Sequence, residues 1–457
     1  MTPPSVAARR SVTSFRHRNY RLFFTGQTIS LIGTWMQQVA QGWLVLQVSG
    51  GNPLWLGIVA AAQFVPVMVL GLFAGVLADV LPKRQTLLAV QVVMMSLAIV
   101  LAVLTATGLA NVWIIVMLAI LLGCANAVDM PVRQSFAIEM VGPRDVANAV
   151  SINSAMFNGA RVVGPAVAGL TIAAFGIALA FALNALSFLA VIVALALIDD
   201  EALHAPRLLP RPRSLADVRV NLVEGLRFVR HTPIVLMSIT VVFLIATFGM
   251  NFSVILPPLA QDVLRSDAAG FGFLMTASGL GALGTAVGLV VAGKPRPSRI
   301  AVGAIVLGIA TLALARSTSF PVSLLLMVPI GAGGIAMAAT ANATIQLNVP
   351  DGLRGRVMSV YTTVFAASVP IGGLAAGALA STIGVLQTLA VGGVLSLATG
   401  VGAFVWWRRI QAASAALPTD AGSAAAGENR PLPQSGAPNT RAAFSPPNPN
   451  EVLKARR

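Results

Sequence analysis

Charge, cysteine and histidine are scarce in this 457-residue chain. Charged residues make up 10% of it, against about 25% in an ordinary soluble domain, while 56% of its residues are hydrophobic. Such a chain cannot cover a water-facing surface with polar groups, so its apolar surplus is expected to face lipid. The single cysteine, Cys124, lies inside an apolar run, which excludes a disulfide framework and a thiolate metal site.

Histidine is absent from the apolar runs. His17, His204 and His231 all fall outside them. A haem, zinc or di-iron membrane enzyme would need histidines or carboxylates inside its bundle. We therefore expect no cofactor, no metal ion and no enzymatic activity.

Twelve apolar segments are long enough to cross a bilayer. A hydrocarbon core about 30 Å thick needs roughly 20 apolar residues in a helix that rises 1.5 Å per residue. The segments lie near 22–48, 55–78, 86–106, 112–128, 147–172, 176–198, 233–256, 270–292, 300–315, 321–341, 357–381 and 385–407. The first is too long for the core of a signal peptide. The sequence thus predicts an all-α membrane protein with 12 transmembrane helices.

Lysine and arginine gather in alternate loops. If both termini lie inside, 27 of the 30 basic residues fall on the cytoplasmic side, only Arg265 and Arg316 fall outside, and Arg161 lies within a span. Because basic loops stay cytoplasmic, the sequence predicts a multi-pass protein of the inner membrane with cytoplasmic N- and C-termini. The net charge of +15 is then a topology signal that also suits anionic lipid heads, and no nucleic-acid partner is expected.

The two halves of the chain share a spaced set of small residues. At an offset of 208 residues the matches are Ser151 with Ser359, Gly164 with Gly372, Gly169 with Gly377 and Gly176 with Gly384. Six spans return the chain to its starting side, so the two copies run in the same direction. Two parallel six-helix repeats are typical of one transporter fold, with the substrate site at their interface near the midplane.

The repeats define the predicted domains. These are a cytoplasmic tail (1–19), a first bundle (20–198), a linker (199–232), a second bundle (233–409) and a final tail (410–457). Apolar residues at helical spacing in the linker indicate an amphipathic helix on the cytoplasmic surface, either a plain connection or a regulatory element. The final tail lacks periodicity and is expected to be disordered.

Three motifs lie on the first bundle. They are Gly75-Val-Leu-Ala-Asp79-Val-Leu-Pro-Lys83-Arg84, Asp129-Met-Pro131-Val-Arg133-Gln134-Ser and Arg161-Val-Val-Gly164-Pro165-Ala-Val-Ala-Gly169. The Gly75 motif resembles the loop between helices 2 and 3 of the major facilitator superfamily. The Arg161 motif is similar to the fifth-helix motif of its proton-coupled exporters. The Asp129 motif resembles the drug:proton antiporter branch that includes enterobactin exporters, and the resemblance covers about residues 15–409.

The resemblance implies an alternating-access carrier whose first, fourth, seventh and tenth helices line a cavity. It further implies an exporter of a drug, siderophore or metabolite, driven by proton antiport and working as a monomer in the lipid bilayer. Residues implied in the conformational switch or coupling are Gly75, Asp79, Lys83, Arg84, Asp129 and Arg133. Residues implied in the fifth-helix motif, where they would thin and bend the helix, are Gly159, Gly164, Pro165 and Gly169.

The chain departs from the superfamily pattern next to Asp79. Val80 and Pro82 stand where the superfamily has Arg and Gly. The arginine that the superfamily uses to link to Asp129 is thus absent at position 80, and Lys83, Arg84 or Arg133 could replace it. Asp79 itself should still favour the N-terminus of the eleventh helix, because a carboxylate is stabilised there by the helix dipole.

Arg161 is the one charge inside any predicted span, about 15 residues into the fifth. A buried arginine in a bilayer costs at least about 2.5–3.5 kcal/mol, so it should face a cavity or a polar partner. It is either a counter-charge for an anionic substrate, a lever in the cycle, or a structural arginine bound to carbonyls and amides.

Asp129, at the cytoplasmic end of the fourth span, has two interpretations. It is either a proton-coupling carboxylate or a latch with nearby basic residues.

Amide side chains indicate a polar cavity around Arg161. Gln37 and Gln41 share a helix face, and Asn251 aligns with Gln38 at an offset of 213 residues. The predicted cavity set is Gln37, Gln38, Gln41, Asn126, Asn158, Arg161 and Asn251. Each amide could instead hydrogen-bond between helices.

The preferred hypothesis is thus a proton-driven exporter of a small organic molecule. An importer or facilitator of a small solute, which could be anionic, is the alternative within transport. A membrane-embedded enzyme or sensor is the alternative outside it, and it lacks paired catalytic residues or a folded output domain.

The implied latch role of Asp79 gives a prediction. Asp79→Asn should slow turnover several-fold while substrate affinity stays near the wild-type value, because the latch would act on the conformational cycle. Transport rates and equilibrium binding on the same preparation separate the two effects, and a loss of affinity alone would contradict the latch.

Overall fold

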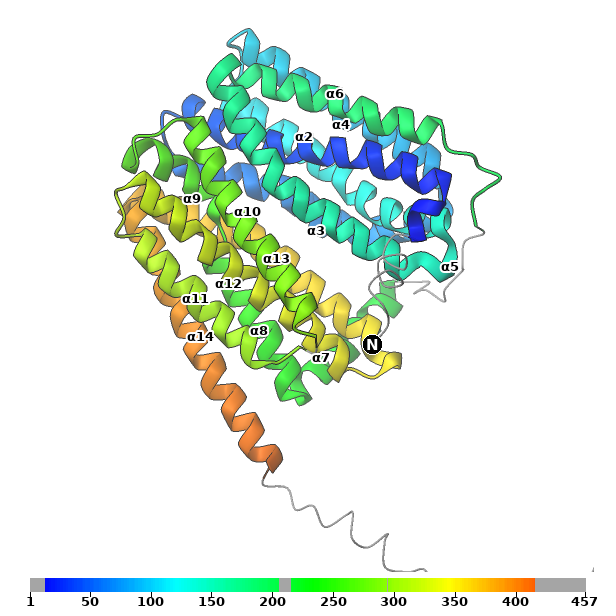
Figure 1. The fold of residues 1–457 in the computed structure, drawn as a ribbon, viewed down its shortest axis with the longest axis vertical. Helices are drawn as coiled ribbons and strands as arrows, with labels where there is room; N and C mark the ends of the chain where they lie inside the picture. Colours follow the sequence, from blue (N-terminus) through cyan, green and yellow to red (C-terminus); the bar gives the residue numbers. More distant parts are fainter. Residues whose placement is uncertain (1–12, 205–214, 294, 416–457) are drawn as a thin grey trace, which may run out of the picture. The chain divides into compact units, whose positions relative to one another are not determined.

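The computed structural model describes residues 13–204, 215–293 and 295–415, and the side chains of 72–80, 215–221, 414 and 415 lie outside this description. Throughout these ranges the regular structure is helical (Figure 1). The expectations for residues 1–12 and 416–457 of the tails and for residues 205–214 of the linker therefore lie outside the described residues.

The first bundle follows the short helix η1 (Thr13–Arg16). Its helices are α2 (Arg18–Val48), α3 (Pro53–Val80), α4 (Lys83–Ala106), α5 (Val112–Phe175) and α6 (Ile177–Ala196). Helix α7 (Leu215–His231) precedes the second bundle. The helices of that bundle are α8 (Pro233–Phe248), α9 (Phe252–Pro258), η2 (Leu259–Val263), α10 (Ala268–Val291), α11 (Ser298–Leu314), α12 (Phe320–Asn348), α13 (Asp351–Ile383) and α14 (Val385–Ala415).

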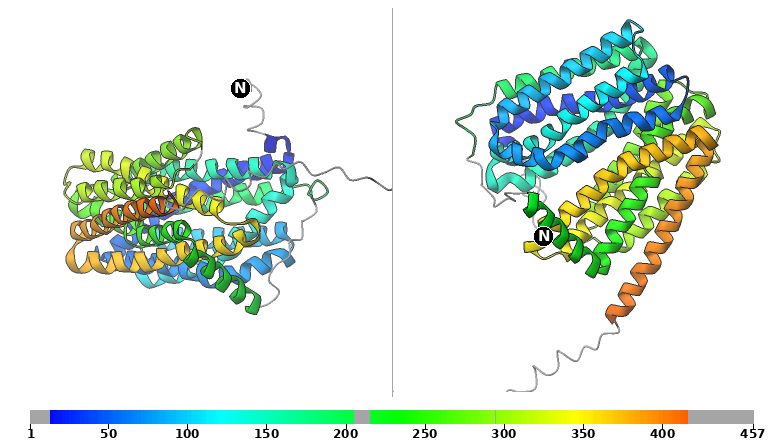
Figure 2. Two further views of the ribbon diagram at one scale, coloured as in Figure 1. Left: turned by 90° about the horizontal axis from the view of Figure 1, so that it is seen from below. Right: turned by 180° about the vertical axis from the view of Figure 1, so that it is seen from behind.

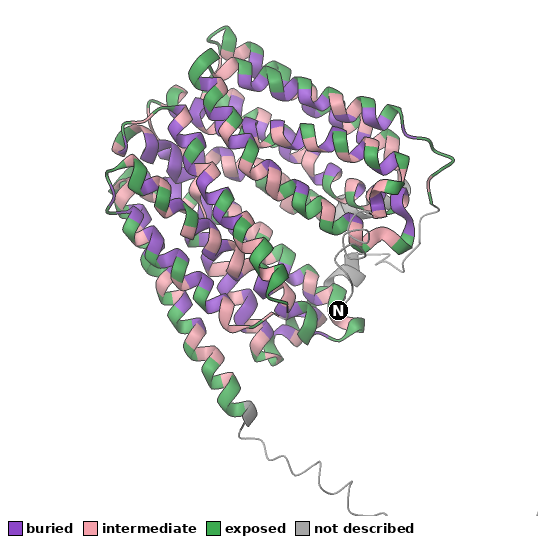
Figure 3. Ribbon diagram, viewed as in Figure 1, coloured by how far each residue is buried: buried purple, intermediate pink, exposed green. Residues whose placement is uncertain are grey.

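The helices suit a bilayer by length and composition. Among the described residues, nine helices are long and apolar enough to cross a membrane, and one of them, α5, has 64 residues. Large apolar side chains such as Val103, Leu170 and Leu186 are more than half exposed, and exposed residues occur along whole helices (Figure 3). The predicted all-α fold of twelve transmembrane helices is confirmed.

Helix α5 contains the fourth and fifth passes without an ordinary loop between them. The sequence predicts the fourth span to end near residue 128, but helix continues to a kink at Gly142, with φ 70° and ψ 170°. Glycine reaches this left-handed φ without a Cβ clash. Gln91 contacts Asp129 and Lys83 contacts Glu139, so α4 runs antiparallel to the first part of α5. Tyr20 contacts Ala149, and Trp35 packs against Gly164, so the second part runs parallel to α2.

The seventh pass is broken, where the sequence predicts one span over 233–256. Helix α8 ends before Gly249, and α9 begins after Asn251. Pro257 and Pro258 then remove two backbone donors, and the π-helical turn η2 follows them. Proline within a helix removes a hydrogen bond and kinks it, and π-turns accommodate such irregularity.

Two seams of close backbone packing join the bundles. In the first, between α3 and α13, a Cβ on Gly57 would clash with the Gly373 carbonyl, and one on Gly377 would lie 2.9 Å from the Pro53 carbonyl oxygen. In the second, between α5 and α10, a Cβ on Gly169 would lie 2.9 Å from the Ala269 Cα. Figure 2 shows these neighbouring helices from two more directions. Small residues permit this approach of helix backbones.

The seams occupy the half of each helix that lies farther from η1. In the nearer half, a Cβ added to Gly71 of α3, Gly159 of α5, or Gly284 and Gly288 of α10 would have no neighbour within 4 Å. Exposed polar side chains, Ser151 and Ser154 among them, lie in that half of α5. Among the described residues, the close glycine contacts between the bundles therefore lie at one end of their helices.

Two glycines of α10 allow a matched test of packing. A methyl group on Gly281 would meet the Val328 carbonyl of α12, whereas one on Gly284 would meet nothing. Because overpacking typically costs about 1–3 kcal/mol, Gly281→Ala should lower the melting temperature of the purified protein by several degrees. Gly284→Ala should leave it unchanged or raise it, and equal effects of the two would contradict this packing.

Candidate functional site

A set of paired charges lies at the η1 end of the first bundle. Asp129 is buried there, and its Oδ1 accepts a hydrogen bond from Gln91 Nε2 at 2.8 Å. Its Oδ2 forms an ion pair with Arg133 at 2.8 Å. Of Lys83, Arg84 and Arg133, the three residues that could replace the usual arginine, Arg133 is thus the one that pairs with Asp129. Gln91 was not predicted, because it is one amide within an apolar run.

Lys83 and Arg84 have other partners. Lys83 forms an ion pair with Glu139 of α5. The Arg84 guanidinium donates to the Leu195 and Ala196 carbonyls at 2.8 Å each and pairs with Asp200 at 2.6 Å. A cation at these carbonyls is favoured by the dipole of α6, since they end that helix.

Gly75 and Asp79 lie on the last turns of α3, and their side chains fall outside the described part of the structure. Their implied role in the switch therefore stays a prediction.

The segment before α2 is attached to the kink of α5. His17 Nε2 lies 3.0 Å from Asp145 Oδ2, and the Ser14 backbone N–H donates to Asn148 Oδ1 at 3.0 Å. The hydrogen bond with His17 is the main cause that lowers the pKa of Asp145 below its ordinary value. His204 adds a contact with the Glu139 carbonyl at 3.1 Å. Sequence reasoning missed this attachment, because its residues are far apart in the chain and outside the apolar runs.

The amides of α2 have different surroundings. Gln37 is buried and accepts a 2.5 Å hydrogen bond from Asn184 of α6. This contact corresponds to the alternative interpretation, in which the amide bonds between helices. Gln41 is also buried, whereas Gln38 is exposed. Asn184, which was not predicted, also receives a hydrogen bond from Ser187 at 3.1 Å.

The other predicted amides each donate to the backbone carbonyl four residues earlier in the chain. Asn126 donates to the Leu122 carbonyl at 3.0 Å and Asn158 to the Ser154 carbonyl at 2.8 Å. Asn251 donates to the Thr247 carbonyl at 2.6 Å and borders a small cavity of the second bundle. No hydrogen bond in the described residues connects the predicted amides with Arg161.

The fifth-helix motif contacts two neighbours. A Cβ on Gly164 would lie 2.5 Å from the Trp35 Cβ of α2, while Pro165 and Gly169 pack on α10. Gly159 faces open space. Between Arg161 and the end of α5 that is farther from η1, the motif therefore packs α5 closely against both α2 and α10.

Arg161 lies where this packing ends. Its guanidinium carbon is 5.9 Å from the centre of the Trp35 ring, and Trp35 in turn meets Phe157 edge-on at 5.6 Å. Its side chain forms no ion pair within the described residues. A cation–π contact contributes about 0.5–2 kcal/mol, which is less than the bilayer cost of a lone arginine, about 2.5–3.5 kcal/mol or more.

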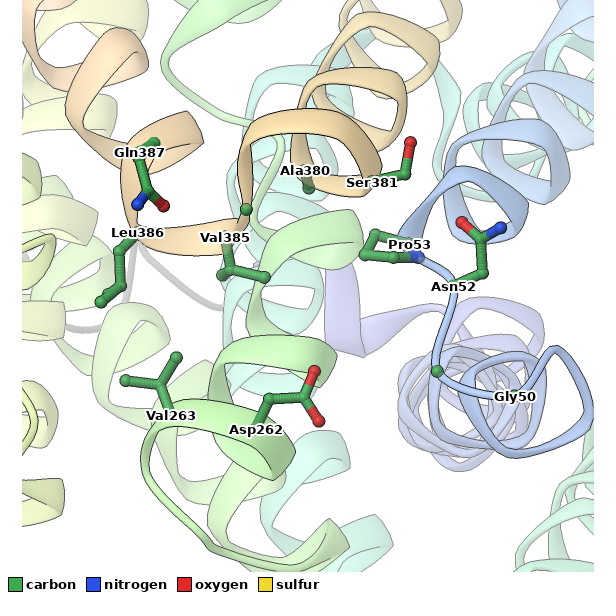
Figure 4. A pocket seen from close by; sticks show the side chains of 12 residues that line it. Gly50, Asn52, Pro53, Asp262, Val263, Ala380, Ser381, Val385, Leu386 and Gln387 are labelled. Carbon is green, nitrogen blue, oxygen red and sulfur yellow. The ribbon is translucent and has the colours of Figure 1, made fainter.

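A separate pocket of about 540 Å³ opens at the far end of the α3–α13 seam. It is lined by the turn after α2, by η2 and by the turn between α13 and α14, and Asp262 is its one charged side chain (Figure 4). It contains none of the predicted site residues.

Comparison with known proteins covers most of the chain. Residues 10–421 match the family described as transmembrane secretion effector. The multidrug efflux pump Tap of Mycolicibacterium fortuitum is 32% identical over 360 residues, which are 77% of this chain and 86% of that protein. The staphyloferrin A transporter of Staphylococcus aureus is 26% identical over 384 residues, which are 82% and 93% of the two chains.

Solved structures share the fold at low sequence identity. A bacterial homologue of the human lysosomal transporter Spinster, in an inward-facing and unoccupied conformation, has a TM-score of 0.66 at 12% identity and covers 86% of this chain and 97% of its own. A peptide transporter of the POT family has a TM-score of 0.69 at 15% identity, covering 86% and 94%. The chain therefore belongs to the transmembrane secretion effector family of major facilitator transporters, and it is a membrane transporter rather than an enzyme.

Proposed function

We propose that this protein exports a small organic molecule across the inner membrane by proton antiport. The observation that carries the proposal is the confinement of both glycine seams to one end of the helices. A carrier must open its substrate site to one side of the membrane at a time, and two bundles joined at one end match one such state. The names of the relatives, a multidrug efflux pump and a staphyloferrin A transporter, support a small-molecule substrate.

The distribution of basic residues supports the orientation that export requires. With both termini cytoplasmic, the η1 end of the bundles faces the cytoplasm and the seams lie toward the outside. An exporter loads its substrate from the cytoplasm, so the open end of this structure is the loading end. Arg161 lies at the end of the α5–α10 seam that is nearer to η1. A substrate that enters from the cytoplasm would reach Arg161 before the closed part of the seam.

Asp129 is the carboxylate that we assign to the coupling mechanism. It is buried, and both of its oxygens have partners, Gln91 on α4 and Arg133 one turn away. A proton that binds Asp129 would remove the charge that holds Arg133 one turn along α5. It would also weaken the charge-assisted hydrogen bond that Gln91 of α4 donates to Asp129. In this proposal the latch and the proton-binding group are the same residue.

Proton antiport gives the first functional prediction. Inverted membrane vesicles that contain the protein and hold an acidic interior should lose part of their proton gradient when a transported compound is added. Fluorescence quenching of a pH-sensitive dye measures the loss, with vesicles that lack the protein as the control. Transport of a compound without any change in the gradient would contradict antiport, and transport of no compound from a drug and siderophore panel would contradict the export function.

The Asp129–Arg133 pair gives a second prediction. Arg133→Gln leaves a buried carboxylate without its cation, so it should destabilise the protein more than Asp129→Asn/Arg133→Gln does. The interaction energy in this double-mutant cycle should be about 0.5–3 kcal/mol. Thermal unfolding of the four purified forms measures it, and additive effects would show that the pair is not coupled.

A further inference from the structure

Arg161 is a cation whose surroundings provide aromatic rings but no counter-charge. Trp35 lies against the guanidinium group, and Phe157, on the same helix one turn away, packs edge-on against Trp35. Within the described residues no carboxylate pairs with Arg161. A guanidinium group in a membrane-spanning helix needs a compensating partner, and aromatic faces compensate it in part only.

Two carboxylates of α5, the helix that carries Arg161, already have basic partners. Asp129 pairs with Arg133, and Glu139 pairs with Lys83. Asp79 lies on the last turns of α3, far along that helix from the seam residue Gly57. The other twelve Asp and Glu residues lie in loops, in α7, in the tail or at the ends of spans.

The position of Arg161 makes it reachable. A Cβ on Gly279 of α10 would lie 3.2 Å from the Arg161 carbonyl oxygen, and Thr276 Oγ1 donates to the Val162 carbonyl at 3.2 Å. Nearer to η1, a Cβ on Gly159 would have no neighbour within 4 Å, and the Phe157 side chain is 45% exposed. The Arg161 side chain itself is partly exposed. The seam thus ends at Arg161, and the aromatic pair borders the open side.

We propose that Arg161, Trp35 and Phe157 bind an organic anion, a substrate that carries a carboxylate or sulfonate next to an aromatic or apolar part. This inference rests on the proposed export function and specifies its substrate class. The planar guanidinium group offers paired N–H donors that match a carboxylate bidentately, and the two rings offer an apolar surface beside it. A cationic drug would be repelled by the positive charge of Arg161.

Two xanthene dyes of similar shape and opposite charge test the proposal. Binding of fluorescein, an anion, and of rhodamine 123, a cation, is measured by fluorescence anisotropy on the full-length protein in lipid nanodiscs, with empty nanodiscs subtracted. We expect fluorescein to bind at least tenfold more tightly than rhodamine 123. Arg161→Gln should weaken fluorescein binding at least tenfold without weakening the binding of rhodamine 123, because it removes a charge that attracts the first dye and repels the second. Arg161→Lys should lie between Gln and wild type.

Arg316→Gln is the matched control. It removes the same charge from an exposed loop residue, so it should leave fluorescein binding unchanged if the effect is local. If Arg161→Gln does not fold, competition on the wild-type protein replaces it, and benzoate should displace fluorescein at concentrations where benzylamine does not.

Failure of this proposal and failure of the export function have different outcomes. Equal or tighter binding of rhodamine 123, no binding of fluorescein, or full fluorescein binding to Arg161→Gln would each overturn the anion site. Proton-coupled transport of cationic compounds alone would also overturn it while the export function stands. If inverted vesicles transport nothing from the panel, the export function fails first.

Discussion

Close contact between glycine backbones is the interaction on which the relation of the two bundles depends. Gly57 meets Gly373 and Gly377 meets Pro53 in one seam, and Gly169 meets Ala269 in the other. These contacts leave no room for a Cβ, so the helices there approach as closely as their backbones allow. Dispersion forces fall steeply with distance, and a lipid environment offers no hydrophobic gain on helix association. The seams therefore hold the bundles only where glycine or a similarly small residue is present.

Charge is distributed unequally between the bundles, although their glycines match. Ion pairs among the described residues of the first bundle join α4 to α5, and Arg84 joins α4 to the end of α6. In the repeat alignment, Arg161 corresponds to Val369 and Asp79 to Ala292. One described ion pair, Arg356 with Glu224, connects α13 of the second bundle to α7. In the proposed antiport, protonation would therefore act on the first bundle, and the other bundle would move as its partner.

The sequence was sufficient for the fold because apolar length and basic loops are strong, local signals. The sequence also identified Arg161 as a candidate, because a single charge within an apolar run can be recognised without knowing what it contacts. It could not give the contacts of that charge, because Trp35 lies on a helix far earlier in the chain. The kink at Gly142 was missed for a related reason: the amphipathic residues around it resemble a loop until Lys83 and Gln91 provide partners for Glu139 and Asp129. At the break near Asn251, Gly372 of α13 packs against Asn251 and the Thr247 carbonyl, a contact between distant residues that local propensity does not encode.

The proposed alternating access, in which the bundles close at the η1 end and separate at the glycine seams, can be measured directly. Spin labels on Arg144 and Arg296 report the η1 end, and labels on Leu109 and Thr318 report the far end, each pair in a Cys124→Ala background. On addition of a transported compound, pulsed dipolar spectroscopy should show the first distance shorten while the second lengthens. If both distances stay unchanged or change in the same direction during transport, the seams do not open and the bundles do not alternate between the two sides.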